Sequence, residues 1–377
     1  MKVHFIKLNH ELLQNHSRLN SIFRTIQRIR MYDNFCKPES ISISSRDGVL
    51  APSTIMLRPL TVFIHNFFSP FSINKLIYDV LTKKQTDNVL LSNDIEVGIT
   101  FRTEDNIVAK YIVQLLKDNK YEKVEVIRYE NNKENRIIFS FESKGSTRSL
   151  DLLRHYGNKS KTYFMLENCV NGIAYYNFIN LTYNKLSFSN EFCFRLESDG
   201  SNVFPYLYEI KKTDPNSYER ILYAMQLIYP VLKDLIFDEK GDILEVKYRH
   251  VSDSSRLDIR MWSHNLFTCL ALFTLLMSPA DWLPRIMLID NVEAGLHPYA
   301  LYLVVEALEA ISANKTVIIS TSSPMIIERI QLDSIFAMQY RDNKVNIKHL
   351  NDKSIQHILQ EHDVLSLFLS GATDVLI

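Results

Sequence analysis

Apolar residues recur along the chain at spacings that predict both helices and buried strands. In residues 17–30 they fall at i, i+3, i+4 and i+7, which predicts an amphipathic helix. Its polar face is basic, through Arg18, Arg24, Arg28 and Arg30. This helix is either a surface helix docked on a core or a contact for a partner or nucleic acid.

Short apolar runs between these helical patterns predict buried strands. They are residues 56–64, 243–248, 285–290 and 316–320. Helical spacing covers residues 74–81, 266–276 and 299–311, and Asp214-Pro215 is a typical helix start, with Asp as N-cap. The strand–helix–strand order in the C-terminal half indicates a parallel sheet with crossover helices.

The region 100–198 mixes short strands and helices. The spacing predicts a helix over 104–117, and the apolar runs 124–129 and 136–141 flank a polar stretch, which predicts a hairpin. No motif in this region indicates a chemistry, so we interpret it as an inserted arm or lid.

Composition excludes several classes of protein. The 377 residues carry 43 basic and 43 acidic side chains, so no overall positive charge points to nucleic acid. The four cysteines lie far apart, and no histidine pair has ligand spacing, which argues against a metal site built from these residues and against a disulfide scaffold. No apolar run is long enough to span a bilayer. We expect a soluble, cytoplasmic protein without membrane contact.

Glycine is scarce, with 9 residues in the whole chain. They are too widely spaced for either GxxxxGK[ST] or GxGxxG. Phosphate binding, if it occurs, therefore takes place without a regular glycine loop.

The segment Ile286–Pro298 joins an apolar strand to an acid, Asp290. Alone it could be an ordinary strand end, but acids at the carboxyl end of a parallel strand also bind ligands. The segment resembles the Walker B and D-loop region of ABC-type ATPase heads, in particular RecF/SMC/OLD-like AAA ATPases. The resemblance implies that Asp290 binds Mg²⁺ and that Glu293 is the second acid. It places Ser263, Gly295, His297 and Pro298 at a head-to-tail interface; holding the local fold is the alternative role.

Four other segments resemble the same family in the same order. They are Arg58–Ile64, Asp199–Asn202, Thr316–Pro324 and Leu365–Gly371. The resemblance implies an α/β fold: an ABC-type P-loop ATPase head, with a mixed or parallel sheet, crossover helices and an inserted α+β arm or lid. We expect an N-terminal extension over 1–41, core segments over 42–99 and 199–377, and the arm over 100–198.

The phosphate loop departs from the family pattern. Where the family has GxNxSGKS, residues 65–72 read HNFFSPFS, so both glycines and the lysine are replaced and only Ser69 and Ser72 remain. Pro70 also removes a backbone donor that a phosphate-binding loop would use. Lys75, one helical turn further on, could substitute for the lysine or could be an ordinary surface lysine.

Other positions that are catalytic in the family also differ from its pattern. Asn291 stands where the family has its catalytic glutamate, and Ser322 where it has the switch histidine. Trp262–Asn265 keeps the serine of the signature segment but not its glycine. A neutral amide cannot act as a general base.

Three hypotheses follow. The first is a pseudo-ATPase scaffold or regulatory subunit, a homodimer or a heterodimer with an ATPase-like subunit, which binds ATP and Mg²⁺ weakly or not at all. The second is an unconventional ATPase that uses Asp290, Ser72 and Lys75 around Mg²⁺. The third is a DNA-associated component that uses the four arginines of the N-terminal helix, whose binding should weaken steeply with salt. The family resemblance suggests bacterial DNA maintenance or anti-phage defence.

Overall fold

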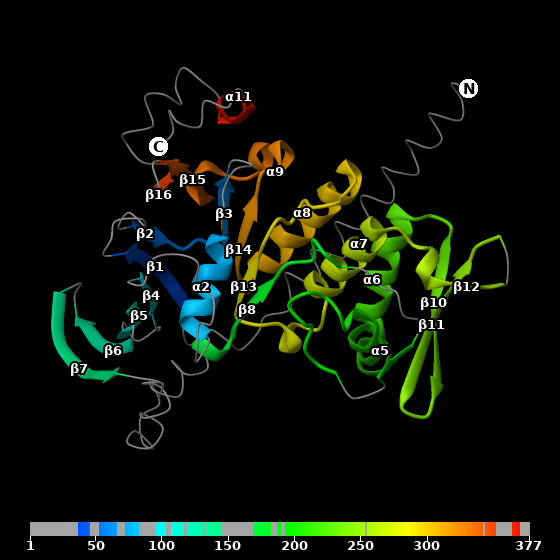
Figure 1. Cartoon of the computed structure of the whole chain (residues 1–377), viewed down its shortest axis with the longest axis horizontal. Helices are drawn as coiled ribbons and strands as arrows, with labels where there is room; N and C mark the ends of the chain where they lie inside the picture. Colours follow the sequence, from blue (N-terminus) through cyan, green and yellow to red (C-terminus); the bar gives the residue numbers. More distant parts are fainter. Residues whose placement is uncertain are drawn as a thin grey trace. The chain divides into compact units, whose positions relative to one another are not determined.

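The computed structural model describes thirteen stretches of the chain. These are residues 37–45, 53–65, 72–82, 95–102, 107–116, 119–130, 133–144, 169–181, 187–189, 193–252, 255–341, 344–351 and 364–369 (Figure 1). The basic helix predicted over 17–30 and most of the segment interpreted as a degenerate phosphate loop, including Ser69, lie outside the described residues.

The chain divides into two compact units. One, here called the α/β unit, comprises residues 31–175, 285–292 and 315–377. The other, here called the helical unit, comprises residues 1–30, 176–284 and 293–314.

A six-stranded sheet forms the centre of the α/β unit, with the order β16-β15-β3-β14-β13-β8. Its strands are β3 (Leu60–His65), β8 (Ile173–Tyr176), β13 (Ile286–Ile289), β14 (Thr316–Thr321), β15 (Ile335–Arg341) and β16 (Lys344–His349). β13, β14, β3 and β15 pair in parallel, and β16 pairs antiparallel with β15. All of β13 is buried, as expected of a parallel strand covered on both faces. The predicted α/β fold with a parallel sheet is therefore confirmed.

The run 56–64 is not one strand, as the sequence predicted. It is divided between β2 (Ser53–Met56) and β3, and the break lies at Arg58 and Pro59. Proline has no N–H to donate to a sheet ladder, which explains why β3 begins at the next residue. The Thr61 hydroxyl closes the turn by accepting a hydrogen bond from the Arg58 N–H at 3.0 Å.

Helix α2 (Ile73–Thr82) packs against this sheet through its apolar face. Ser72 begins the helix, since its hydroxyl accepts a hydrogen bond from the Lys75 N–H at 2.9 Å. Asn74 is fully buried, and its side-chain amide donates to the carbonyl oxygens of Ile289 at 3.2 Å and Ile318 at 3.5 Å. One amide thus connects α2 to two neighbouring strands, β13 and β14.

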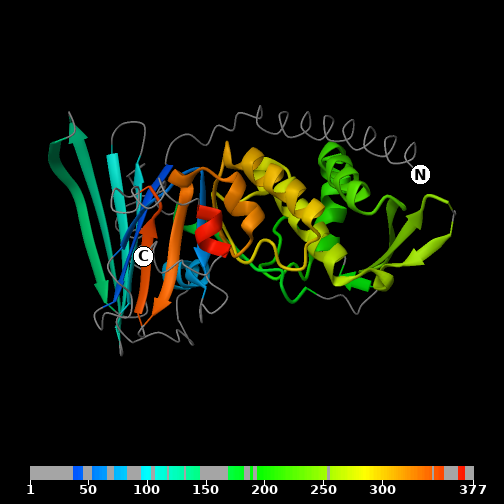
Figure 2. The same ribbon diagram turned by 90° about the horizontal axis from the view of Figure 1, so that it is seen from above.

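A second sheet of the α/β unit is antiparallel, with the order β2-β1-β4-β5-β6-β7. The remaining strands are β1 (Lys37–Ser45), β4 (Ile95–Arg102), β5 (Ile107–Leu116), β6 (Asn119–Glu130) and β7 (Lys133–Lys144), drawn from blue to green in Figure 2. β6 and β7 confirm the predicted hairpin. The domain boundaries stay a prediction, and one of them, residue 100, falls inside β4.

The helix predicted over 104–117 is wrong, because the described part of this segment, Ile107–Leu116, forms the strand β5. It pairs antiparallel with both β4 and β6. Its residues Ala109, Tyr111 and Val113 are buried while Lys110, Ile112 and Gln114 are half-buried, which is the period of two of a strand. The segment is rich in β-branched residues, whose preference for strands agrees with the two neighbours that pair with it.

The helical unit holds four α-helices and a small sheet among its described residues. The helices are α5 (Val203–Thr213), α6 (Pro215–Ile228), α7 (His264–Leu276) and α8 (Pro298–Ser312). The predicted start of α6 is confirmed, since the Asp214 carboxylate accepts a hydrogen bond from the Ser217 N–H. α7 is buried from Phe267 to Leu276, and α5, α6 and α8 pack around it.

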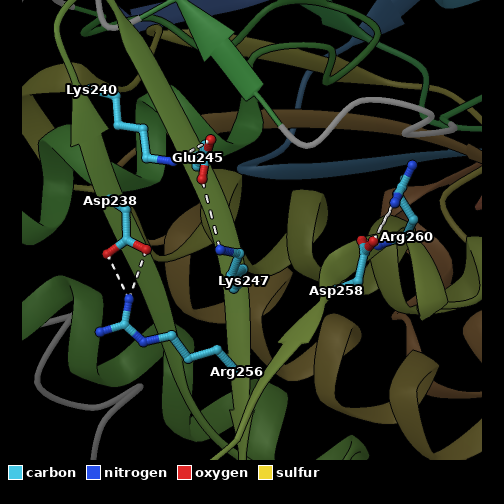
Figure 3. Close-up of polar contacts among 7 residues, drawn as sticks. All are labelled: Asp238, Lys240, Glu245, Lys247, Arg256, Asp258 and Arg260. Atoms are coloured by element: carbon cyan, nitrogen blue, oxygen red, sulfur yellow. Dashed lines mark hydrogen bonds and ion pairs between the residues drawn. The ribbon is translucent and has the colours of Figure 1, made fainter.

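The small sheet of this unit comprises β9 (Ser187–Ser189), β10 (Leu232–Lys240), β11 (Ile243–His250) and β12 (Arg256–Asp258). One of its faces is charged and paired, as Figure 3 shows: Arg256 with Asp238, Lys240 and Lys247 with Glu245, and Arg260 with Asp258. Exposed ion pairs of this kind contribute about 0–1 kcal/mol each. The face is therefore a solvated surface rather than a source of stability.

Replacing Asn74 should test the link between α2 and the parallel sheet. We expect Asn74→Ala to lower the free energy of unfolding by about 1–2 kcal/mol, because two buried hydrogen bonds are lost. Denaturant titration measures the change, with Lys75→Ala on the exposed side of the same helix as the matched control. Equal stability of the two variants would contradict this role of Asn74.

Candidate functional site

The acid predicted to bind Mg²⁺, Asp290, directly follows β13 in the α/β unit and is 2% exposed. Its Oδ2 accepts a hydrogen bond from the Tyr175 hydroxyl at 2.8 Å. Its Oδ1 accepts one from the Ser320 hydroxyl, also at 2.8 Å. The strands β8, β13 and β14 are neighbours, so three chain segments meet at this carboxylate.

Asn291, which the family resemblance predicts to stand at the position of the catalytic glutamate, adopts a left-handed backbone conformation with φ of 48°. Its N–H donates to the Ser320 hydroxyl oxygen at 3.2 Å. Asparagine tolerates this conformation better than glutamate does, because its short side chain can bond locally. The turn after β13 therefore suits the asparagine that the sequence has.

Two residues of the predicted phosphate site are described, Ser72 and Lys75, and both make contacts within α2. The Ser72 hydroxyl caps the helix, as described above. The Lys75 side chain is 56% exposed, and its Nζ lies 3.8 Å from the Asp79 carboxylate. The same Nζ lies 5.5 Å from the centroid of the Tyr175 ring, which places it near the Asp290 cluster without contacting the acid.

The described residues do not by themselves complete a site for a magnesium–nucleotide complex, and residues 66–71 of the predicted phosphate loop lie outside them. Mg²⁺ requires nearly octahedral coordination by oxygen, and it is usually held by carboxylates together with phosphate oxygens and water. Here both oxygens of Asp290 already accept hydroxyl hydrogens, and the Ser72 oxygen accepts a backbone N–H. Within the described part of the chain, no group of three or more His, Cys, Asp or Glu side chains could hold a metal ion.

The signature segment lies in the helical unit, at the start of α7. Ser263 is exposed and is the N-cap residue, without a side-chain capping bond. The preceding Trp262 packs against Phe267, four positions into the helix, with ring centroids 5.9 Å apart. This pair is a hydrophobic staple, which fixes the direction in which the chain enters the helix. Trp262 also packs against Tyr248 of β11, at 5.6 Å.

Gly295, in the predicted D-loop, lies against the predicted signature segment within the same unit. Gly295 has φ of +70°, and a Cβ at this position would lie 3.2 Å from Asn265 Oδ1 and 3.4 Å from the His264 ring. The His264 Nδ1 in turn lies 2.7 Å from the Leu181 carbonyl oxygen. The structure therefore brings Ser263 and Gly295 into one exposed region of the helical unit.

His297 and Pro298 begin α8, which agrees with the alternative role given to them above, that of holding the local fold. The His297 Nδ1 accepts a hydrogen bond from the Tyr299 N–H at 3.2 Å, and Pro298 occupies the first helical position. Both are exposed. Glu293 is half-buried in a turn closed by the Leu296 N–H, and it belongs to the helical unit rather than to the unit that holds Asp290. Its role as a second acid stays a prediction.

Sequence reasoning did not find Tyr175, Ser320 or Asn74 as partners of the Asp290 region. Ser320 could have been found, because the parallel pairing of Ile289 with Ile319 places the two following residues side by side. Tyr175 lies 115 positions from Asp290 in a region without a motif. Its contact depends on β8 lying beside β13, and no local pattern predicts that pairing.

The fold is that of an ABC-type ATPase head. Residues 81–328 match the family described as "AAA domain, putative AbiEii toxin, Type IV TA system". The match covers well over half of the chain, and the chain belongs to this family. No curated protein sequence matches the chain.

Solved structures with the same fold are heads of SMC proteins. An SMC head bound to the C-winged helix domain of ScpA has a TM-score of 0.51 and 14% identity, over 83% of this chain and 98% of that chain. A Pyrococcus furiosus SMC head with an extended coiled coil, bound to the C-terminal domain of ScpA, has a TM-score of 0.50 and 13% identity, over 86% and 99%. Across the described residues, no helix is long and apolar enough to cross a membrane.

Replacing Gly295 should disturb the contact between the D-loop and the signature segment. We expect Gly295→Ala to lower the free energy of unfolding by about 1–3 kcal/mol, because a left-handed conformation and a close contact both oppose a Cβ. Gly241→Ala is the matched control, since Gly241 has φ of +61° but nothing within 4 Å of its Cβ position. The excess cost of Gly295→Ala over Gly241→Ala, measured by denaturant titration, reports the contact, and no excess would argue against it.

Proposed function

We propose that this chain is an ATPase-like regulatory or scaffold domain that acts through protein partners and does not hydrolyse ATP. The observation that carries the proposal is Asn291, a neutral amide in a left-handed turn at the position of the general base. Its N–H is also bonded to Ser320, so the turn is part of the sheet edge. An amide cannot accept the proton of an attacking water, and no change of rotamer can make it a base.

The retained surface of the helical unit supports a partner-binding role. Ser263, Gly295, His297 and Pro298 are all exposed, and Gly295 packs against the signature segment. We propose this surface as the interface with a second copy of the chain or with an ATPase-like subunit. The two SMC heads above were solved with domains of ScpA, a separate protein, and a partner of that general kind fits a head without its own hydrolysis.

The setting we propose is a bacterial DNA-maintenance or anti-phage defence complex. It rests on the family, whose description includes a type IV TA system. Direct DNA contact by Arg18, Arg24, Arg28 and Arg30 is part of this proposal; these residues lie outside the described part of the chain.

A weak Mg²⁺-dependent ATPase is the second candidate. It is favoured by the retained acid Asp290 and by Lys75, whose Nζ approaches the Tyr175 ring next to that acid. Under this hypothesis Ser69, Ser72 and Lys75 bind phosphate and Asp290 binds Mg²⁺. It predicts ATP binding that is lost in Asp290→Ala.

Phosphate release and calorimetric titration with ATP and Mg²⁺ test the two candidates together. We expect the wild-type chain to show no turnover and no binding tighter than about 100 μM, which corresponds to about −5.5 kcal/mol. Binding or turnover that disappears in Asp290→Ala would overturn the proposal in favour of the second candidate.

Restoring the glutamate alone should not restore hydrolysis. We expect Asn291→Glu to remain without turnover and to lose about 1 kcal/mol of stability, because glutamate is less well suited to φ of 48°. Asn291→Gly, which accepts this conformation, is the matched control for folding. Turnover by Asn291→Glu would show that the missing base is the only defect of the site.

A further inference from the structure

The side chain that most directly limits access to Asp290 is Tyr175. Its hydroxyl donates to Asp290 Oδ2, while Ser320 donates to Oδ1, so neither carboxylate oxygen is left without a donor. Asp290 is nearly inaccessible to water. A divalent cation arriving here would compete with these hydroxyls for the electron density of the carboxylate oxygens.

We propose that Tyr175 closes Asp290 to divalent cations, so that a neutral hydroxyl takes the place that a metal would need. The inference rests on the proposed function and deepens it, because it names the residue that removes the metal from the site. In this chain the acid Asp290 is retained, but the hydrogen bond from Tyr175 on β8 lowers its affinity for a cation.

The position of Tyr175 is well defined by its surroundings. Its ring stacks on Tyr78 of α2, with centroids 5.8 Å apart and planes at 27°. The Lys75 ammonium lies 5.5 Å from the same ring. Two residues of α2 therefore hold the ring in the orientation that aims its hydroxyl at Asp290, and the side chain is buried.

Substituting Tyr175 changes fewer other contacts than substituting Ser320 does. The Ser320 hydroxyl donates to Asp290 and also accepts the Asn291 N–H, so its removal would disturb the backbone of the turn. Phenylalanine at position 175 would keep the ring contacts with Tyr78 and Lys75 and would remove the hydrogen bond to Oδ2. The freed oxygen is then available to a cation.

The size of the effect follows from the hydrogen bond with which a cation competes. Hydrogen bonds to charged groups are among the stronger ones in proteins, so removing one competitor should raise cation affinity about ten- to a hundredfold. Carboxylate oxygens are the ligands that Mg²⁺ and Mn²⁺ prefer.

Titration of the full chain with Mn²⁺ alone, without nucleotide, tests the proposal. Free Mn²⁺ is measured by its electron paramagnetic resonance signal. The variants are Tyr175→Phe, Asp290→Asn, the double variant Tyr175→Phe/Asp290→Asn, and Tyr78→Phe. Tyr78→Phe is the matched control, because it removes a hydroxyl from the ring stacked on Tyr175 without removing the hydrogen bond to Asp290. Thermal unfolding of each variant confirms that it is folded.

We expect Tyr175→Phe to bind Mn²⁺ about tenfold or more tightly than the wild-type chain, and the double variant to lose this gain. Tyr78→Phe and Asp290→Asn should titrate like the wild-type chain. A folded Tyr175→Phe that binds Mn²⁺ no better than Tyr78→Phe would overturn the proposal.

The comparison of the wild-type chain with Asp290→Asn does not require Tyr175→Phe to fold. Weaker Mn²⁺ binding in Asp290→Asn would mean that Asp290 is open to cations in the wild-type chain, and it too would overturn the proposal. Because nucleotide is absent, this result is independent of the turnover assay. ATP hydrolysis by a chain whose Mn²⁺ titration follows the expectation would count against the proposed function and leave the role of Tyr175 standing.

Discussion

The edge of the parallel sheet depends on how the buried carboxylate of Asp290 is satisfied. A buried charge is costly unless hydrogen bonds replace its water, and here two hydroxyls do so at 2.8 Å each. They come from β8 and β14, the strands on either side of β13. The bonds that stabilise the charge also compete with a cation for its oxygens, and this is the physical basis of the proposed role of Tyr175.

Two residues near Asp290, Asn291 and Asn74, form hydrogen bonds that are consistent with this arrangement. The Ser320 hydroxyl that donates to Asp290 also accepts from the Asn291 N–H, and the left-handed turn at Asn291 is one that asparagine tolerates. Asn74 connects α2 to the ends of β13 and β14 through two main-chain carbonyls. Asp290 and Asn291 are thus both hydrogen-bonded to Ser320, which gives this sheet edge a structural role.

Local sequence patterns predicted correctly the helix starts that depend only on neighbouring residues. The start of α6 at Asp214 and Pro215 and the start of α8 at Pro298 follow from capping, which involves only adjacent residues. The segment 104–117 shows the opposite case. Its apolar residues fit a helical spacing, but pairing with β4 and β6 makes it a strand, because neighbouring strands decide between periods that a short sequence leaves ambiguous.

The sequence by itself determined the class of the fold, through the order of apolar strands and helices. The replacement of the family's lysine, base, signature glycine and switch histidine is a prediction that the family resemblance makes at single positions. Only the tertiary structure decided what surrounds Asp290. Tyr175 is 115 positions away from it, and their contact exists because β8 pairs beside β13. Periodicity records which face of an element is buried, but not which strand becomes its neighbour. The partners of a buried charge are therefore decided by strand order, which no local pattern encodes.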